Sequence, residues 1–328
     1  MQDRRKLSNY TPVSDETVSN ASPLSSYKTF PSRYIKSHVL GEGGFGVVHA
    51  AIRVSDGVPV AIKEILKKSV TKWRSIEGVC VPLEYCLLRQ VSHIDGVVKV
   101  LDACQSDDYF FIIMERIEPS EDLYEFLKKR GSLPEDMAQS FFRQVVEIIN
   151  ECYLAGVLHR DIKDENIIVD LKNLKLKIID FGSGSYVKDS IFHEFYGTKI
   201  YSPPEWIRDK KYGGMPLTMW TLGVLLYVMV TGRLPFQKPE QILKARIVFP
   251  PGMDISSECQ QLIRRLLRSS PEDRLSMQEL LSHQWFLSDA DTDTDGIDIN
   301  FAEGTDSQLY TSGNMGYIHD THNAATYR

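Results

Sequence analysis

The spacing of apolar positions along the chain changes near residue 120. Before that point the pattern predicts short β-strands at 39–51, 58–65, 97–101 and 110–114 and one helix at 82–91. After it, apolar residues recur at helical spacing over 123–129, 134–156, 215–231, 256–268 and 276–282. The change predicts an α+β, bilobal architecture, in which a small β-rich lobe precedes a larger helical lobe across a cleft.

Both ends of the chain depart from this pattern. Residues 1–33 are rich in Ser, Thr, Asn and Asp, and residues 287–328 are acidic and then rich in Gly, Ser, Asn and Thr. Segments with so little apolar surface cannot offset the entropy lost when a chain orders, so we expect two disordered tails. Between them we expect one domain at 34–286, with its N-terminal lobe at 34–116 and its C-terminal lobe at 122–286.

Composition and charge narrow the class of protein. The chain has 328 residues, 42% hydrophobic and 25% charged, which is ordinary globular composition. A net charge of −6 argues against non-specific nucleic-acid binding, which needs a basic face. The five cysteines lack a CxxC pair and favour a reducing compartment. Without a secretory signal, and with its longest apolar run only at 222–230, the chain is expected in cytoplasm or nucleus.

Two short segments carry the densest candidate chemistry. Residues 159–166 read His-Arg-Asp-Ile-Lys-Asp-Glu-Asn and place a carboxylate, an ammonium group and an amide within one loop. Residues 180–182 read Asp-Phe-Gly and follow an apolar run that is typical of a strand. Groups of these kinds, at this spacing, fit phosphoryl transfer, which needs an oriented hydroxyl and divalent metal held against phosphates.

The residue types suggest a role for each group. Asp161 would orient the acceptor hydroxyl and accept its proton, and Lys163 would stabilise the migrating phosphoryl group. Asn166 and Asp180 would hold the metal ions through their oxygens. Because this chemistry depends on positioning and charge neutralisation, all four residues are needed together.

A glycine-rich loop lies upstream, between two predicted strands. Gly41, Gly43 and Gly46 form a GxGxxG pattern, and glycines let the backbone approach phosphates closely. Dinucleotide-binding folds place this pattern before a helix, whereas here a second strand follows. Lys63, near the end of the next predicted strand at 58–65, can neutralise phosphate oxygens, with Glu84 as its candidate partner. An exposed strand lysine and a solvent-facing Glu84 are the alternatives.

Together these motifs resemble the protein kinase superfamily over residues 34–286. Lys163 and the Gly-Thr pair ending at Thr198 are similar to its serine/threonine members, and Thr198 joins the catalytic group by this resemblance. The Pro-Pro-Glu-Trp run at 203–206 is similar to the PIM family, with PAS-domain kinases next nearest. The resemblance implies a serine/threonine protein kinase acting on protein substrates; the alternative is a pseudokinase-like scaffold.

The resemblance also implies a nucleotide site for ATP with Mg²⁺, for which Mn²⁺ can substitute. Its residues would be Leu40, Gly41, Gly43, Gly46, Val48, Ala61, Lys63, Met114, Glu115, Ile117 and Ile168. PIM kinases carry a proline at the position of Ile117. Proline lacks an N–H group, so we predict that Ile117 restores a second hydrogen bond to adenine.

Glu194 stands where most kinases carry a phosphorylatable threonine. Its carboxylate is predicted to pair with Arg160 and to order the activation loop without phosphorylation. A solvated Glu194 is the alternative. A second ion pair is expected between Arg274 and Glu205.

The PIM resemblance implies protein substrates with basic residues before the acceptor. The carboxylates expected to bind these residues are Asp122, Glu125, Asp164 and Glu165. Two further acidic positions of that family are Val228 and Arg233 here, which puts a demand for more distant basic residues in doubt. We expect a monomer with no nucleic-acid or membrane partner.

Overall fold

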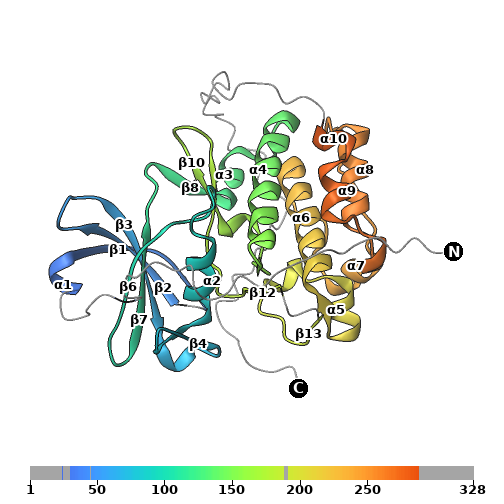
Figure 1. The fold of residues 1–328 in the computed structure, drawn as a ribbon. Coiled ribbons are helices and arrows are strands. Elements are labelled where there is room, and N and C mark those ends of the chain that lie inside the picture. Colours follow the sequence, from blue (N-terminus) through green and yellow to red (C-terminus); the bar gives the residue numbers. More distant parts are fainter. Residues whose placement is uncertain (1–23, 25–29, 45, 188–190, 288–328) are drawn as a thin grey trace.

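The computed structural model describes residues 24, 30–44, 46–187 and 191–287. Strands form most of the first lobe and helices most of the second, which confirms the predicted α+β bilobal architecture (Figure 1). The predicted tails lie outside the described residues, except for Leu24, residues 30–33 and Leu287.

A five-stranded antiparallel sheet, in the order β1-β2-β3-β7-β6, forms the N-terminal lobe. Its strands are β1 (Tyr34–Gly43), β2 (Gly46–Arg53), β3 (Pro59–Leu66), β6 (Val100–Gln105) and β7 (Tyr109–Glu115). Strand β6 begins three residues later than predicted. The reason is that Val97 makes only an isolated parallel bridge to Ile178, outside the sheet.

Side-chain alternation along β3 decides which residues face the helix of this lobe. Successive side chains of a strand point to opposite faces of the sheet. Ile62 packs in a small cluster on one face, whereas Ala61 and Ile65 belong to the main core. Lys63 lies between Ala61 and Ile65 in this alternation, so it faces the same side as α2 (Leu83–Val91).

Two short elements between β3 and α2 give no sequence signal. They are the 3-10 helix η3 (Lys67–Ser69) and the hairpin of β4 (Trp73–Ile76) and β5 (Val79–Pro82). The hairpin turns at Glu77 and Gly78, whose φ angles are 49° and 80°. Two-residue hairpin turns favour positive φ at both positions, but glutamate is not typical of them, so the pattern does not mark the turn.

The folded domain begins before the predicted boundary at residue 34. Helix α1 (Phe30–Arg33) leads directly into β1. Phe30 is 6% exposed, and its ring centroid lies 4.9 Å from that of Phe111 and 5.5 Å from that of Tyr34. A single buried ring in a polar stretch produces no periodicity, which is why the sequence pattern assigned these residues to a tail.

Helices build the C-terminal lobe. They are α3 (Leu123–Arg130), α4 (Glu135–Leu154), α5 (Pro204–Asp209), α6 (Gly214–Thr231), α7 (Pro239–Lys244), α8 (Ser257–Leu266), α9 (Met277–Leu281) and α10 (Gln284–Leu287). The five predicted helices match α3, α4, α6, α8 and α9 within two residues at each end. The other three are only four to six residues long and show no usable period.

Short strands and 3-10 helices connect the two lobes and the larger helices. They are β8 (Ser120–Asp122), β9 (Val157–Leu158), η4 (Asp164–Asn166), β10 (Ile167–Asp170), β11 (Leu176–Ile178), β12 (Ser185–Tyr186), β13 (Ile191–Phe192), η5 (Lys199–Tyr201), β14 (Tyr212–Gly213) and η6 (Pro271–Asp273). In the sheet β11-β10-β8, Ile167 pairs with Ile178. Residues 159–166 precede β10 and residues 180–182 follow β11. Because β10 and β11 are antiparallel, both segments lie at the same end of this sheet.

Helix α6 is long and apolar enough to cross a membrane by length and composition, the one such helix in the described part of the chain. Its 18 residues are more than the apolar run at 222–230, which the sequence pattern judged too short to span a membrane. However, 89% of it is buried inside the protein. A helix that is apolar all round fits the core of a folded domain.

We expect Phe30→Ala to lower the free energy of unfolding by about 3 kcal/mol, because it removes a buried ring and leaves a cavity beside Phe111. Ile35→Ala, at a 62% exposed position on the next strand, is the control and should cost less than about 1 kcal/mol. Urea denaturation followed by circular dichroism measures both. Equal costs would mean that Phe30 adds nothing to the stability of the domain.

Candidate functional site

The Lys63 side chain joins the two lobes. Its Nζ donates to Glu84 Oε1 on α2 at 2.5 Å and to Asp180 Oδ1 at 2.9 Å. Lys63 and Glu84 are both buried. Burial alone would lower the pKa of Lys63, but the charges of Glu84 and Asp180 outweigh it and raise this pKa. The ammonium group therefore stays charged, and Glu84 faces Lys63 instead of solvent.

Asp180 is held in an unusual backbone conformation just after β11. Its φ is 62°, in the left-handed region that residues other than glycine rarely adopt. Its Oδ1 also accepts a hydrogen bond from Gly182 N at 3.0 Å. Burial opposes ionisation, but the Lys63 ammonium lowers the pKa of Asp180 below its ordinary value. The carboxylate is therefore charged and fixed toward the N-terminal lobe.

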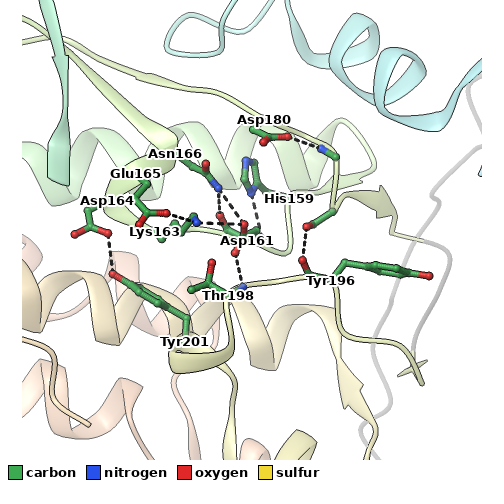
Figure 2. A network of polar contacts seen from close by, with 12 residues as sticks. His159, Asp161, Lys163, Asp164, Glu165, Asn166, Asp180, Tyr196, Thr198 and Tyr201 are labelled. Carbon is green, nitrogen blue, oxygen red and sulfur yellow. Dashed lines mark hydrogen bonds and ion pairs between the residues drawn. The ribbon is translucent and has the colours of Figure 1, made fainter. Parts of the chain in front are cut away.

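Contacts on both carboxylate oxygens fix Asp161 (Figure 2). Oδ1 accepts from the main-chain N of Thr198 at 2.9 Å, and Oδ2 accepts from Asn166 Nδ2 at 3.2 Å. The Lys163 ammonium lies 4.0 Å from Oδ2. The structure thus brings together Asp161, Lys163, Asn166 and Thr198, with Thr198 contributing its main chain.

His159 connects the catalytic segment to the segment that contains Asp180. Its Nδ1 accepts from Asp161 N at 3.2 Å, so Nε2 carries the proton and donates to Ile179 O at 2.9 Å. The ring also contacts Phe181 edge-on, with centroids 4.7 Å apart. Burial lowers the pKa of His159, so the ring is neutral. Sequence reasoning assigned no role to this residue.

Asn166 and Asp180 fit a divalent cation. Ile179 N donates to Asn166 O at 3.0 Å, so the two residues lie on adjacent backbone segments. Asn166 Nδ2 donates to Asp161, which turns the carboxamide oxygen away from Asp161. Within the described residues, no cluster of His, Cys, Asp and Glu could bind a metal alone. Mg²⁺ commonly takes one or two protein oxygens and completes its shell with phosphate, which matches this donor set.

The glycine loop between β1 and β2 lies close to β3. Gly46 has a φ of 132°, and a Cβ there would lie only 2.2 Å from Glu64 O, so glycine is required. A Cβ at Gly41 or Gly43 would meet no described atom within 4 Å. The backbone on that side of the loop is open and could approach phosphates.

The predicted adenine contacts come from strands of both lobes. Val48 on β2 lies opposite Lys63, and Ala61 on β3 lies opposite Met114 on β7. Ile168 on β10 belongs to the other lobe, and Leu40 on β1 is 45% exposed. The strand pairing therefore groups Val48, Ala61 and Met114 beside Lys63.

Glu115 and Ile117 lie in the segment that links the lobes. The Glu115 carboxylate accepts from Lys99 N at 2.9 Å and pairs with Lys177 at 2.9 Å. The Ile117 carbonyl accepts from Ser120 Oγ at 2.8 Å, and the Ile117 side chain is half-buried. These contacts hold the chain where it leaves β7 and enters the linking segment.

The structure corrects the role predicted for Asp164. Its carboxyl group is buried and accepts a hydrogen bond from the Tyr201 hydroxyl at 3.1 Å. Burial raises the pKa of Asp164 to about 6. Asp164 is therefore an internal contact of the catalytic loop, not an exposed carboxylate for a basic substrate. The sequence could not reveal this, because Tyr201 is 37 residues away.

The other three predicted substrate carboxylates lie near one another. Asp122 caps α3 and accepts from Glu125 N at 2.8 Å, and β8 places it opposite Ile168. Burial raises the pKa of Asp122, and the nearby charges of Glu125 and Glu165 raise it further. Glu165 is half-exposed and contacts Lys163. Glu125 in turn contacts Lys128 at 2.9 Å, so two of the three carboxylates already face a lysine.

The structure also corrects the ion pair predicted between Arg160 and Glu194. The Glu194 carboxylate accepts from the Tyr196 hydroxyl at 2.5 Å. Arg160 Nη2 instead donates to the main-chain O of Glu194 at 3.0 Å and to the Tyr212 hydroxyl. A buried arginine at this position finds its acceptors among backbone and aromatic groups, while the carboxylate stays nearer to solvent.

The second predicted ion pair is confirmed. Arg274 Nη1 and Nη2 donate to the two oxygens of Glu205 at 2.8 and 2.5 Å, and both side chains are buried. Such a paired geometry is the strong form of an arginine–carboxylate contact. It ties helix α5 to the residue that follows η6.

Comparisons with known proteins agree with this site. The protein kinase domain family matches residues 34–286. Serine/threonine-protein kinase pim-2 of Danio rerio is 41% identical over 268 residues, which cover 79% of this chain and 86% of the relative. Serine/threonine-protein kinase prk-2 of Caenorhabditis elegans is 40% identical over 261 residues, covering 79% and 59%. The PAS domain-containing serine/threonine-protein kinase of Mus musculus is 35% identical over 250 residues, covering 75% and 18%.

The chain therefore belongs to the protein kinase family. It is a serine/threonine protein kinase, and its relatives confirm the resemblance to PIM kinases that the sequence motifs suggested. A domain of this family uses ATP and a divalent metal ion and acts on protein substrates.

Asp164→Asn should gain stability relative to wild type as the pH rises. The folded-state pKa of Asp164 is about 6, above the value of about 4 for an unfolded aspartate. The neutral acid therefore stabilises the fold at low pH, and this contribution is lost as the pH rises through 6. Urea unfolding should show an advantage for the variant that grows by about 1 kcal/mol between pH 5 and pH 8. An advantage that is independent of pH would contradict the raised pKa.

Proposed function

We propose that this kinase transfers the γ-phosphate of ATP, bound with Mg²⁺ or Mn²⁺, to serine or threonine residues that follow basic residues in protein substrates. The observation that carries the proposal is the Lys63 junction. One charged ammonium group contacts Glu84 in one lobe and Asp180 in the other. Asp161 is held by Thr198 N at the same end of the β10–β11 pair as Asp180.

The chain's own residues supply orientation, charge and a proton acceptor. The nucleotide brings the phosphoryl group, and the cation neutralises charge on its phosphate oxygens. Thr198 N and Asn166 hold the Asp161 carboxylate, which can accept the proton of the acceptor hydroxyl. Burial opposes the charge of Lys163, but the carboxylates around it raise its pKa, so it stays positive beside Asp161.

We infer a preference for basic substrates from the carboxylates Asp122, Glu125 and Glu165, which lie at the start of α3 and in η4. Burial is the main cause of the raised pKa of Asp122, and repulsion from the charges of Glu125 and Glu165 adds to it. A cationic side chain would relieve this repulsion on binding. Arg233 is exposed, and it opposes a basic preference at more distant substrate positions.

We propose further that the enzyme is active without a phosphate on its activation loop. The support is the environment of Arg160, which already has acceptors in Glu194 O and the Tyr212 hydroxyl. A phosphate commonly orders such a loop by pairing with arginine. Here the arginine is enclosed by uncharged groups.

A pseudokinase-like scaffold is the alternative, and the complete set of Lys63, Asp161, Asn166 and Asp180 disfavours it. A cytoplasmic or nuclear location is also proposed. Its support is that Cys86, Cys104, Cys152 and Cys259 are buried free thiols, which suit a reducing compartment.

Transfer of labelled phosphate to two serine peptides tests the proposal. One peptide carries arginine three residues before the acceptor, and the other carries glutamate there. We expect kcat/KM to be at least about tenfold higher for the arginine peptide, which corresponds to about 1.4 kcal/mol. Asp161→Asn should lower kcat by about 10²-fold or more, since it removes the proton acceptor.

The same assay distinguishes a wrong substrate preference from a lack of kinase activity. Asp122→Asn should reduce the ratio between the peptides while phosphate transfer to the glutamate peptide persists. Equal use of both peptides by the wild type would exclude the basic preference. No transfer to either peptide, with ATP and Mg²⁺ present, would favour the scaffold.

Ile117→Pro should weaken ATP binding by about tenfold, because proline removes the N–H group proposed to bind adenine. Isothermal titration calorimetry of the full chain measures the Kd. Ile117→Val, which keeps the amide and the β-branched shape, is the matched control and should bind as the wild type does. If the proline variant binds ATP equally well, the amide is not used.

A further inference from the structure

The guanidinium group of Arg160 is surrounded mainly by aromatic rings. It is buried, and its Cζ lies 3.9 Å from the ring centroid of Phe192 and 5.5 Å from that of Tyr212. Its Nε and Nη1 have no hydrogen-bond partner among the described residues. Cation–π attraction strengthens when the cation is desolvated, so these rings stabilise the buried charge.

The Tyr212 hydroxyl closes a ring of three hydrogen bonds. It accepts from Arg160 Nη2 and donates to the main-chain O of Glu194 at 3.0 Å. Arg160 Nη2 also donates to this same carbonyl at 3.0 Å. Because burial raises the pKa of Tyr212, the hydroxyl keeps its proton and remains a donor. One tyrosine thus binds both the catalytic segment and the activation loop.

Strand pairing and ring packing fix the position of Tyr212. In the β13–β14 ladder, Phe192 pairs with Tyr212, and their rings stack with centroids 5.4 Å apart and planes 26° apart. Phe195 and Trp206 meet the Tyr212 ring edge-on at 5.6 and 5.9 Å. Rings in such arrangements attract one another beyond their burial, so the hydroxyl has little freedom to move.

These contacts reach the catalytic base through a short segment of the activation loop. Arg160 and Tyr212 hold the segment at Glu194, and Asp161 Oδ1 holds it four residues later at Thr198 N. Arg160 and Asp161 are neighbours in the chain. Two adjacent residues of the catalytic segment are therefore fastened to the two ends of residues 194–198.

We propose that Tyr212 is a positioning residue for phosphoryl transfer, acting through Arg160 and Glu194 on the orientation of Asp161. This inference rests on the proposed kinase activity. Release of the Glu194 end would let Thr198 and the Asp161 carboxylate drift from the geometry that the acceptor hydroxyl needs, and small displacements of this kind are costly. The nucleotide contacts lie elsewhere and would not change.

The test compares two Tyr→Phe variants of the full chain. Tyr212→Phe should lower kcat about tenfold toward the arginine peptide and leave the KM for ATP within about twofold. Tyr227→Phe is the matched control, because Tyr227 is equally buried and its hydroxyl donates to Val248 O at 2.7 Å, away from the site. Both variants should show a similar decrease in Tm, of about 2–4 °C.

A double-mutant cycle decides whether Tyr212 acts through Arg160. In an Arg160→Met background, Tyr212→Phe should lower kcat by less than about threefold, since Arg160 is already gone and only the hydrogen bond to Glu194 O remains to be lost. A full tenfold loss in that background would overturn the proposal. So would an unchanged kcat in the single variant, or an equal loss in Tyr227→Phe. Wild-type transfer to the peptide, measured first, reports the kinase activity independently of these outcomes.

Discussion

The burial of the Lys63 ammonium is the constraint on which the arrangement of both lobes depends. A charge removed from water costs several kcal/mol unless opposite charges meet it with good geometry. Here those charges come from Glu84 in the N-terminal lobe and Asp180 in the C-terminal lobe. Glu84 lies in the same lobe as Lys63, and Asp180 adds a second acceptor from the other lobe. The relative position of the lobes is therefore linked to the charge state of one residue.

Strand alternation and a strained backbone place the two carboxylates that compensate the Lys63 charge. Because Lys63 shares a face with Ala61 and Ile65, it points toward the helix that carries Glu84. On the other side, Asp180 reaches the lysine from a left-handed conformation with a φ of 62°. A strained residue of this kind persists only where its surroundings determine it strongly. Gly182 N and the Lys63 ammonium both hold its carboxylate.

The sequence predicted the features that are local or that repeat. The long helices were found within two residues because a period of 3.6 recurs several times along them. The residues of the catalytic loop were found because their spacing lies within one short segment. Elements without repetition, such as α1 and the β4–β5 hairpin, were missed. Charge alone predicted the pairs Arg274–Glu205 and Lys63–Glu84 correctly. It failed for Glu194, which bonds to Tyr196, and for Asp164, which is buried against Tyr201.

In both errors the carboxylate accepts from a tyrosine hydroxyl, an uncharged donor that charge complementarity does not consider. It also leaves out main-chain groups, which a folded loop offers at fixed positions. Asp161 binds the N–H of Thr198, and Arg160 binds the carbonyl of Glu194. Any residue at 194 supplies that carbonyl. The constraint falls instead on Gly197, where a Cβ would lie 3.0 Å from Arg160 O, and on the aromatic residues that enclose the arginine.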